Sequence, residues 1–254
     1  MRRFQIIIAI LIVILSLGFF SYHYIQQQQL KDTSQMFDQV MSEKMALLYD
    51  QAQDWSKPVQ LDIHDRRLAG NYKKISEFLL NYWVQNINAR NAYLRALKAA
   101  QWDTFLDVTR LEQDQKQQYA QTQKMLNDVR QASVLYQNQY EQIHQAFLTE
   151  AKTLSVEPDM RILLEKKIGS NQKVDQDHAI FLLEMQILDK ADAMFAILKT
   201  HAWERNGKKI LFRDTAQVKA FNQLYQDVLR LNAKIESIKK RNMAALDQQL
   251  KDAT

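Results

Sequence analysis

Cysteine is absent from the chain, and its 254 residues include only four glycines and two prolines. Without cysteine there is no disulfide, no thiolate nucleophile, no cysteine-based metal site and no acylated cysteine of a lipoprotein. Glycine and proline provide many turn conformations, so their scarcity argues against Gly-rich phosphate-binding and dinucleotide-binding loops and favours long helices. We therefore predict an all-α protein, an elongated helical bundle with coiled-coil-like long helices.

A strong charge of one sign is also lacking. The formal net charge is +5, and Arg2 and Arg3 supply two of those charges. No Lys/Arg stripe carries interleaved aromatic residues, so nucleic-acid binding is not predicted. Short basic clusters at 166–167, 208–209 and 239–241 could meet an anionic head group, but solvated helix faces and turns explain them more simply.

One long hydrophobic run is present, near the N-terminus. The residues from Ile6 to Phe20 are apolar except for Ser16, and the run can be extended to Ile25. Such a segment forms a helix of about 30 Å, which matches the hydrocarbon core of a bilayer. Arginines before it and aromatic residues after it favour a cytoplasmic N-terminus. The residues expected to form this membrane anchor are Arg2, Arg3, Ile6, Phe19, Phe20, Tyr22 and Tyr24.

A cleaved signal peptide is the alternative interpretation of this run. Ser16-Leu17-Gly18 has the small-x-small pattern of a cleavage site, but Phe19-Phe20 comes immediately after it and the apolar run hardly pauses. We favour the uncleaved anchor, and both interpretations export the rest of the chain. We therefore expect a cytoplasmic N-terminus and transmembrane helix at 1–25 and an extracytoplasmic helical domain at 26–254. The expected location is the bacterial inner membrane, crossed once, with most of the chain in the periplasm.

Apolar residues recur at helical spacing through most of the remaining chain. Together with the few helix breakers, this spacing predicts helices at about 26–55, 67–101, 103–153, 157–169, 172–201 and 214–250. Between the last two, Asn206-Gly207 separates two short alternating runs. This pattern predicts a small β-hairpin near 203–212 with Asn206 and Gly207 at the centre of a type I′ turn, and an irregular loop is the alternative.

The last predicted helix carries two apolar rows with a seven-residue repeat. Two such rows are typical of a helix that packs along its length against another helix, so they form a candidate interaction seam. Asn242 continues one row, where it could fix the register of packing or mark its end. The seam consists of Phe221, Leu224, Val228, Leu231, Ile235 and Ile238.

No catalytic motif is present, and we expect no enzymatic activity, cofactor or metal ion. The five histidines form no zinc-peptidase pattern. Two polar clusters, at 175–178 and 62–65, are weak metal candidates that helix starts and turns also explain. A pair of carboxylates suffices for glycoside hydrolysis, which the sequence alone does not exclude. An aromatic stripe could line a ligand pocket, although core packing is the simpler explanation; it comprises Tyr72, Phe78, Tyr82, Trp83 and Tyr93.

The segment from Asn206 to Leu224 resembles a pattern of YiaF-type envelope proteins of Gram-negative bacteria, which carry a domain of unknown function. An Asn206-Gly207 turn leads to Phe212, and Phe221-Asn222 with Leu224 comes nine residues later. This chain departs from the pattern in a longer spacing between the turn and Phe212, and it lacks the lipobox cysteine of the lipoprotein members. The resemblance implies an envelope location and supplies no activity.

Three functions are compatible with these features. The first is a structural or interaction protein that binds a protein partner or a second copy through helix faces. The second is a module that binds a lipid or small amphiphile in a groove beside the aromatic stripe. The third is a helical adaptor of an envelope transport assembly, although the β-rich domains usual in such adaptors are missing. We favour the first, because the anchor and long helices are present and site motifs are not.

Overall fold

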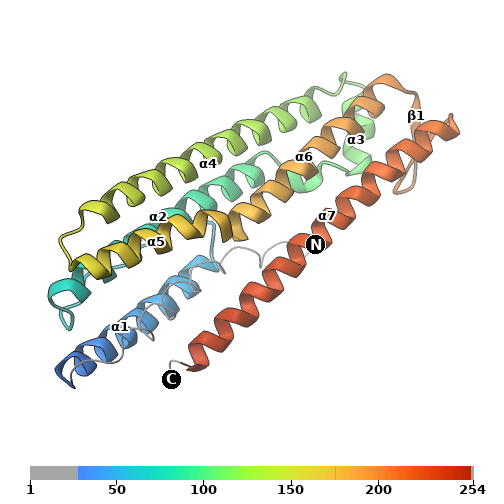
Figure 1. Cartoon of the computed structure of the whole chain (residues 1–254). Helices are drawn as coiled ribbons and strands as arrows, with labels where there is room; N and C mark the ends of the chain where they lie inside the picture. The colour runs from blue at the N-terminus through green and yellow to red at the C-terminus, as the bar shows by residue number, and fades with distance from the viewer. Residues whose placement is uncertain (1–27, 175, 253–254) are drawn as a thin grey trace. The chain divides into compact units, whose positions relative to one another are not determined.

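The computed structural model describes residues 28–174 and 176–252, and it confirms a mostly helical protein with one small hairpin (Figure 1). The predicted anchor at 1–25 lies outside the described residues. Among the helices that are described, none is both long and apolar enough to cross a membrane. The elements are α1 Gln28–Ala52, α2 Gly70–Ala99, the 3-10 turn η3 Trp102–Thr104, α3 Val108–Gln115, α4 Ala120–Thr153, α5 Pro158–Val174, α6 Gln176–Thr200, β1 Trp203–Asn206, β2 Lys209–Phe212 and α7 Thr215–Asp252.

The chain divides into two compact units. Of the described residues, unit 1 comprises 28–92, 136–174, 176 and 239–252, and unit 2 comprises 93–135 and 177–238. Each unit has its own hydrophobic core. Helices α2, α4 and α7 each contribute residues to both units.

The core of unit 1 is built by α1, α2, α4, α5 and the segment between α1 and α2. The ring of Phe147 on α4 packs edge-on against Phe78 and Tyr82 of α2, with centroids 5.2 and 5.1 Å apart. Trp83 is among the largest fully buried side chains. Burial of a large apolar side chain contributes about 1.5–3 kcal/mol, so these aromatic residues are major contributors to the stability of the unit.

Helix α5 begins as its sequence predicts, with Pro158 at the first helical position and Asp159 in the first turn. The prediction that it ends near Gly169 is wrong, because the helix continues to Val174. An internal glycine costs about 1 kcal/mol relative to alanine. Burial of Leu164 and Ile168 on the same helix offsets that cost.

The predicted single helix over 103–153 is also wrong, since the chain turns between Gln115 and Ala120 in unit 2. Gln118 and Tyr119 have φ angles of 55° and 62°, in the left-handed region that favours glycine. The Tyr119 N–H donates to Asp114 O at 2.8 Å and the Gln118 N–H donates to Gln115 O at 3.1 Å, which is the hydrogen-bond pattern of a Schellman motif. A glutamine here takes the place that glycine usually fills.

The predicted β-hairpin is confirmed, with β1 and β2 paired antiparallel. Asn206 pairs with Lys209, so the two central turn residues are Gly207 and Lys208, not Asn206 and Gly207. Gly207 has a φ of 61°, and no positive φ occurs at Lys208. A positive φ at the first central position alone is the pattern of a type II′ turn. The predicted type I′ turn is therefore wrong in type, and its central residues lie one position later than predicted.

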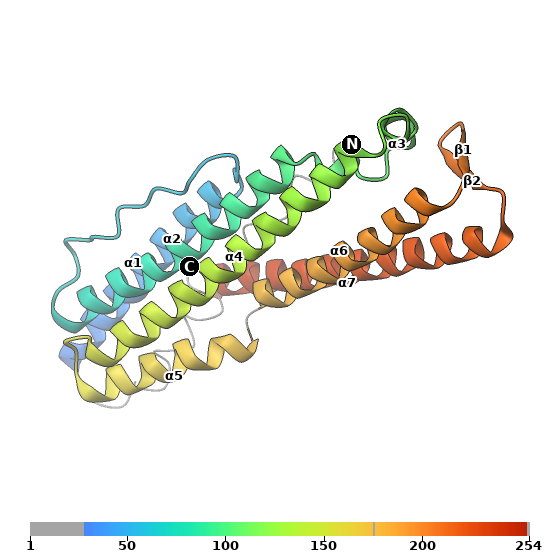
Figure 2. The same cartoon turned by 90° about the horizontal axis from the view of Figure 1, so that it is seen from above.

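Helices α1 and α2 run in the same direction, and the connection between them returns along their length (Figure 2). Helix α1 has 25 residues, so this return covers about 37 Å. An extended chain advances about 3.3 Å per residue, so a short turn cannot make the connection. We call residues 53–69 the strap.

At its far end the strap is fixed to α1 by an ion-pair cluster. The Arg67 guanidinium donates to Glu43 of α1 and to Asp65 of the strap, with N–O distances of 2.5 and 2.8 Å. The hydrogen bonds from Arg67 lower the pKa of Asp65 to about 2. An aspartate with a lowered pKa contributes stability above its unfolded pKa of about 3.9 and loses that contribution as the pH falls toward the folded value.

Replacing Arg67 with alanine should therefore destabilise the protein more at pH 5 than near pH 2. The expected loss is small even at pH 5, because the pair faces solvent and water screens its attraction. Urea unfolding at both pH values measures it. Arg66→Ala, which removes a neighbouring exposed cation, is the matched control, and equal pH dependence of the two variants would contradict the assignment.

Candidate functional site

The strap lies along unit 1 with alternating exposure. Val59 is buried, Leu61 and Ile63 are partly buried, and the residues between them face solvent. Alternation with a period of two is typical of an extended chain that lies on a surface. The Lys44 ammonium of α1 also holds the strap, donating to the carbonyl oxygens of Asp62 and His64 at 2.6 and 3.3 Å.

Asn88 of α2 binds the main chain of Val59 with both atoms of its side-chain amide. The Val59 N–H donates to Asn88 Oδ1 at 2.7 Å, and Asn88 Nδ2 donates to Val59 O at 3.1 Å. In an extended chain the N–H and C=O of one residue point to the same side, where a neighbouring strand would pair with them. The Asn88 amide takes the place of that neighbouring strand.

We expect Asn88→Ala to lower the free energy of unfolding by about 1–3 kcal/mol, because both polar groups of the buried Val59 lose their partner. Limited proteolysis should then cut the strap faster than in the unchanged protein. Gln85→Ala, one turn earlier on α2 and exposed, is the control. Equal cleavage rates in the two variants would contradict the role given to Asn88.

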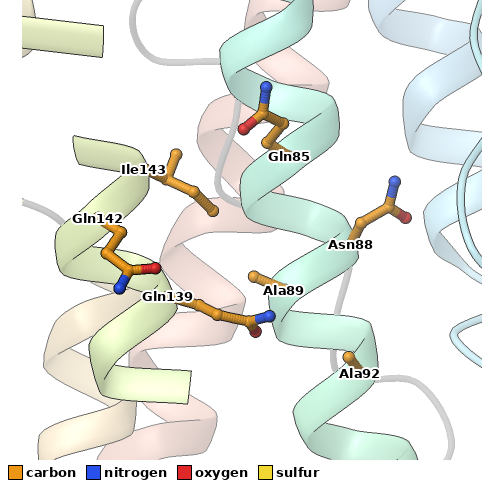
Figure 3. A pocket seen from close by; sticks show the side chains of 7 residues that line it. All are labelled: Gln85, Asn88, Ala89, Ala92, Gln139, Gln142 and Ile143. Atoms are coloured by element: carbon orange, nitrogen blue, oxygen red, sulfur yellow. The ribbon is translucent and has the colours of Figure 1, made fainter. Parts of the chain in front are cut away.

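A shallow groove of about 390 Å³ lies between α2 and α4 in unit 1 (Figure 3). We call it the amide groove, because four of the seven residues that line it carry a side-chain amide. None of the seven is charged. They are Gln85, Asn88, Ala89 and Ala92 of α2 and Gln139, Gln142 and Ile143 of α4.

The amides of the groove differ in what they already bind. Gln85 Nε2 donates to Asn81 Oδ1 at 3.1 Å, and Asn88 is directed away from α4 toward the strap (Figure 3). Gln139 extends across the groove toward Ala89 in the same view. Gln139 and Gln142 are both exposed, and in the described part of the chain neither side chain makes a hydrogen bond.

The candidate interaction seam of α7 packs within the chain. Phe221 belongs to the core of unit 2 with Leu224 and Val228 packed against it, and Leu231 and Ile235 are buried. Ile238 is partly buried. The two-row pattern therefore identified the face by which α7 packs on its own protein, and a partner would need another surface.

The residues of the aromatic stripe form core, not a pocket wall. Phe78, Tyr82, Trp83 and Tyr93 are buried, and the partly buried Tyr72 packs against Phe37 at 5.4 Å between centroids. The amide groove contains none of them.

The two polar clusters proposed as weak metal candidates have different outcomes. At 62–65, His64 Nδ1 pairs with Glu77 Oε1 at 2.7 Å and Asp65 binds Arg67, so the cluster contributes to the strap. In the cluster at 175–178, Asp175 lies outside the described residues. Among the residues that are described, no group of three or more His, Asp or Glu side chains is arranged to hold a metal ion.

Two buried asparagines stand out in unit 1. Asn91 of α2 is 0 % exposed and Asn242 of α7 is 2 % exposed, and the amide atoms of both have no hydrogen-bond partner among the described residues. The sequence singled out Asn242 as a polar residue in an apolar row, and its burial shows that packing continues to that position. Nothing in the sequence distinguished Asn91, Asn88 or the glutamines of the groove.

Comparison with known proteins assigns no family. No protein-family model matches the chain, and neither a curated protein nor a solved structure matches it.

Proposed function

We propose that this chain is a membrane-tethered helical protein of the bacterial cell envelope with a structural or protein-interaction role and no catalytic activity. The apolar segment at 6–25, with Arg2 and Arg3 before it, supports the tether and the export of the remaining chain. The resemblance of residues 206–224 to YiaF-type envelope proteins supports the location. A partner in this role is another protein or a second copy, and no nucleic acid is involved.

The observation that carries the interaction role is an apolar stripe on the outside of α7 in unit 2. Val218, Tyr225 and Leu229 are 36 %, 39 % and 43 % exposed, although all three are large apolar side chains. Their spacings of seven and four residues place them on one face of the helix, beside the buried seam. Apolar surface that stays in water loses the stabilisation that burial would give, so several exposed apolar side chains on one helix face support a contact surface there.

Two measurements on the full chain in its native membrane test this proposal. The protein should remain in the membrane fraction after alkaline carbonate extraction, and extraction into the soluble fraction would contradict the tether. A photo-crosslinking amino acid at Tyr225 should give one specific crosslinked product. The same amino acid at Lys234, which is exposed on the far side of α7, should not. A chain that stays monomeric, with no product from either position, would contradict the interaction role.

The alternative of a lipid or small-amphiphile binding module has no such support. Small-molecule sites are concave and mostly apolar, and they enclose most of the ligand. The amide groove is shallow and four of its seven lining residues carry polar amides, while the aromatic residues that were candidates for a pocket wall are buried, Tyr72 only partly.

A further inference from the structure

The amide groove offers hydrogen-bonding groups and room for a main chain. Ala89 and Ala92 give it a floor of small side chains, so a backbone can approach α2 closely. Each glutamine amide presents one carbonyl oxygen and two N–H donors. Gln139 and Gln142, three residues apart on one face of α4, present these groups on one wall of the groove.

The protein already uses this chemistry once, on the same helix. Asn88, which is part of the groove's lining, binds the N–H and C=O of Val59 in the strap. This contact between a side-chain amide and an extended main chain lies beside the groove, on the side of α2 that is turned away from α4. The strap covers the side of α2 to which Asn88 is directed. The side of α2 toward α4 is also lined by amide side chains, and no segment of the described chain covers it.

The spacing of the two glutamines fits an extended chain. Three residues of α-helix advance about 4.5 Å, whereas successive peptide groups on one side of an extended chain are about 6.6 Å apart. The glutamine side chain has three rotatable bonds, so the two amides can spread by the remaining distance of about 2 Å. They can therefore pair with two successive residues that face the same side.

We propose that the amide groove binds an extended, uncharged segment of a partner polypeptide through its main chain, with Gln139 and Gln142 as the pairing residues. This assignment rests on the proposed interaction role, and it states what kind of polypeptide one binding site of the protein would recognise. A charged segment is disfavoured, because the lining contains no charge to neutralise one. Main-chain pairing gives affinity for the extended form, and side chains of small or β-branched residues would meet Ala89, Ala92 and Ile143.

A random dodecapeptide library displayed on phage, selected against the purified full-length chain in detergent, tests the proposal. Selection should enrich uncharged peptides rich in β-branched residues, which favour extended conformations. Synthetic copies should bind at least ten-fold more weakly to the double variant Gln139→Ala/Gln142→Ala, and to Ala92→Arg, which fills the groove. Copies that are N-methylated at alternate residues lose main-chain donors and should also bind at least ten-fold more weakly.

Gln145→Ala, an exposed glutamine of α4 outside the groove, is the matched control and should bind the peptides unchanged. Urea midpoints equal to that of the unchanged protein establish that the variants are folded. Failure to select a peptide, selection of charged peptides, or binding that survives the double variant or N-methylation would overturn the proposal. So would a groove crosslink, from a photo-crosslinking amino acid at Gln142, that joins two copies of the chain. Persistence of the Tyr225 crosslink in the groove variants would show that the interaction role stands even where this assignment fails.

Discussion

Replacing Asp114 with alanine is expected to lower the free energy of unfolding by about 3–5 kcal/mol, the usual cost of breaking a buried ion pair from one side. The Asp114 side chain is fully buried in unit 2 and caps α4 from the preceding helix. Its Oδ1 accepts the Gln121 N–H at 2.9 Å, and its Oδ2 accepts the N–H and hydroxyl of Thr122 at 2.7 and 2.6 Å. A carboxylate at this end also interacts favourably with the dipole of α4.

The expected loss of unfolding free energy exceeds that of an ordinary helix cap, because the substitution also removes the carboxylate beside the Arg110 guanidinium. Its Nη1 lies 3.6 Å from Asp114 Oδ2, and its side chain is largely buried. Asp114→Asn keeps one acceptor oxygen and should lose roughly half as much. Asp128→Ala, which removes the exposed partner of Lys124, should cost less than about 0.5 kcal/mol. Urea unfolding at 25 °C measures all three, and an Asp114→Ala loss no larger than the control would contradict the capping role.

Asp114 also explains why the break between α3 and α4 was not predictable from the sequence. The rules for ending a helix look for glycine or proline, and residues 115–120 contain neither. Here the left-handed conformation falls on Gln118 and Tyr119, where it costs on the order of 1–3 kcal/mol for each residue. Hydrogen bonds between Asp114 and residues seven and eight positions later hold the turn, and such contacts leave no periodic signal.

Helices and turns that depend on residues close together in the sequence were predicted well. Helical periodicity located α1, α2, α6 and α7 to within a few residues, because each buries one face and leaves the other in solvent. The hairpin was predicted because Gly207 readily adopts a positive φ. The turn that forms needs only that one positive φ, and its central residues lie one position later than predicted.

The candidate site could not be predicted in the same way. Asn88 and Val59 are 29 residues apart, and their pairing depends on where the strap returns along α1 and α2. The amide groove exists only because the Gln139 face of α4 meets the Ala89 face of α2. In the sequence, glutamine and asparagine at these positions resemble those of any solvated helix face. The seam of α7 illustrates the converse, because a correct pattern named the right residues and left open whether they meet the same chain or another.

Replacing Tyr119 with phenylalanine is the second change with a large expected effect, a loss of about 2–4 kcal/mol of unfolding free energy. The Tyr119 hydroxyl donates to Leu198 O at 2.8 Å and accepts from Trp203 Nε1 at 2.6 Å. It thus joins the start of α4 to the end of α6 and to the hairpin. Each buried polar group left without its partner costs about 1–3 kcal/mol, and the substitution leaves two while changing little volume.

Urea unfolding measures the loss, and exchange of the Trp203 indole N–H with solvent, followed by NMR, locates it. The exchange should accelerate in Tyr119→Phe and stay unchanged in Tyr225→Phe, which removes an exposed hydroxyl from the same unit. A double-mutant cycle with Trp203→Phe separates the direct pair from general loosening, because the two losses should be less than additive. Strict additivity, or an unchanged exchange rate of the Trp203 indole, would mean that the hydroxyl does not connect the hairpin to the helices. The exposed stripe of α7 comes directly after that hairpin in the chain, so crosslinking from Tyr225 should weaken in Tyr119→Phe if the hydroxyl also positions the start of α7.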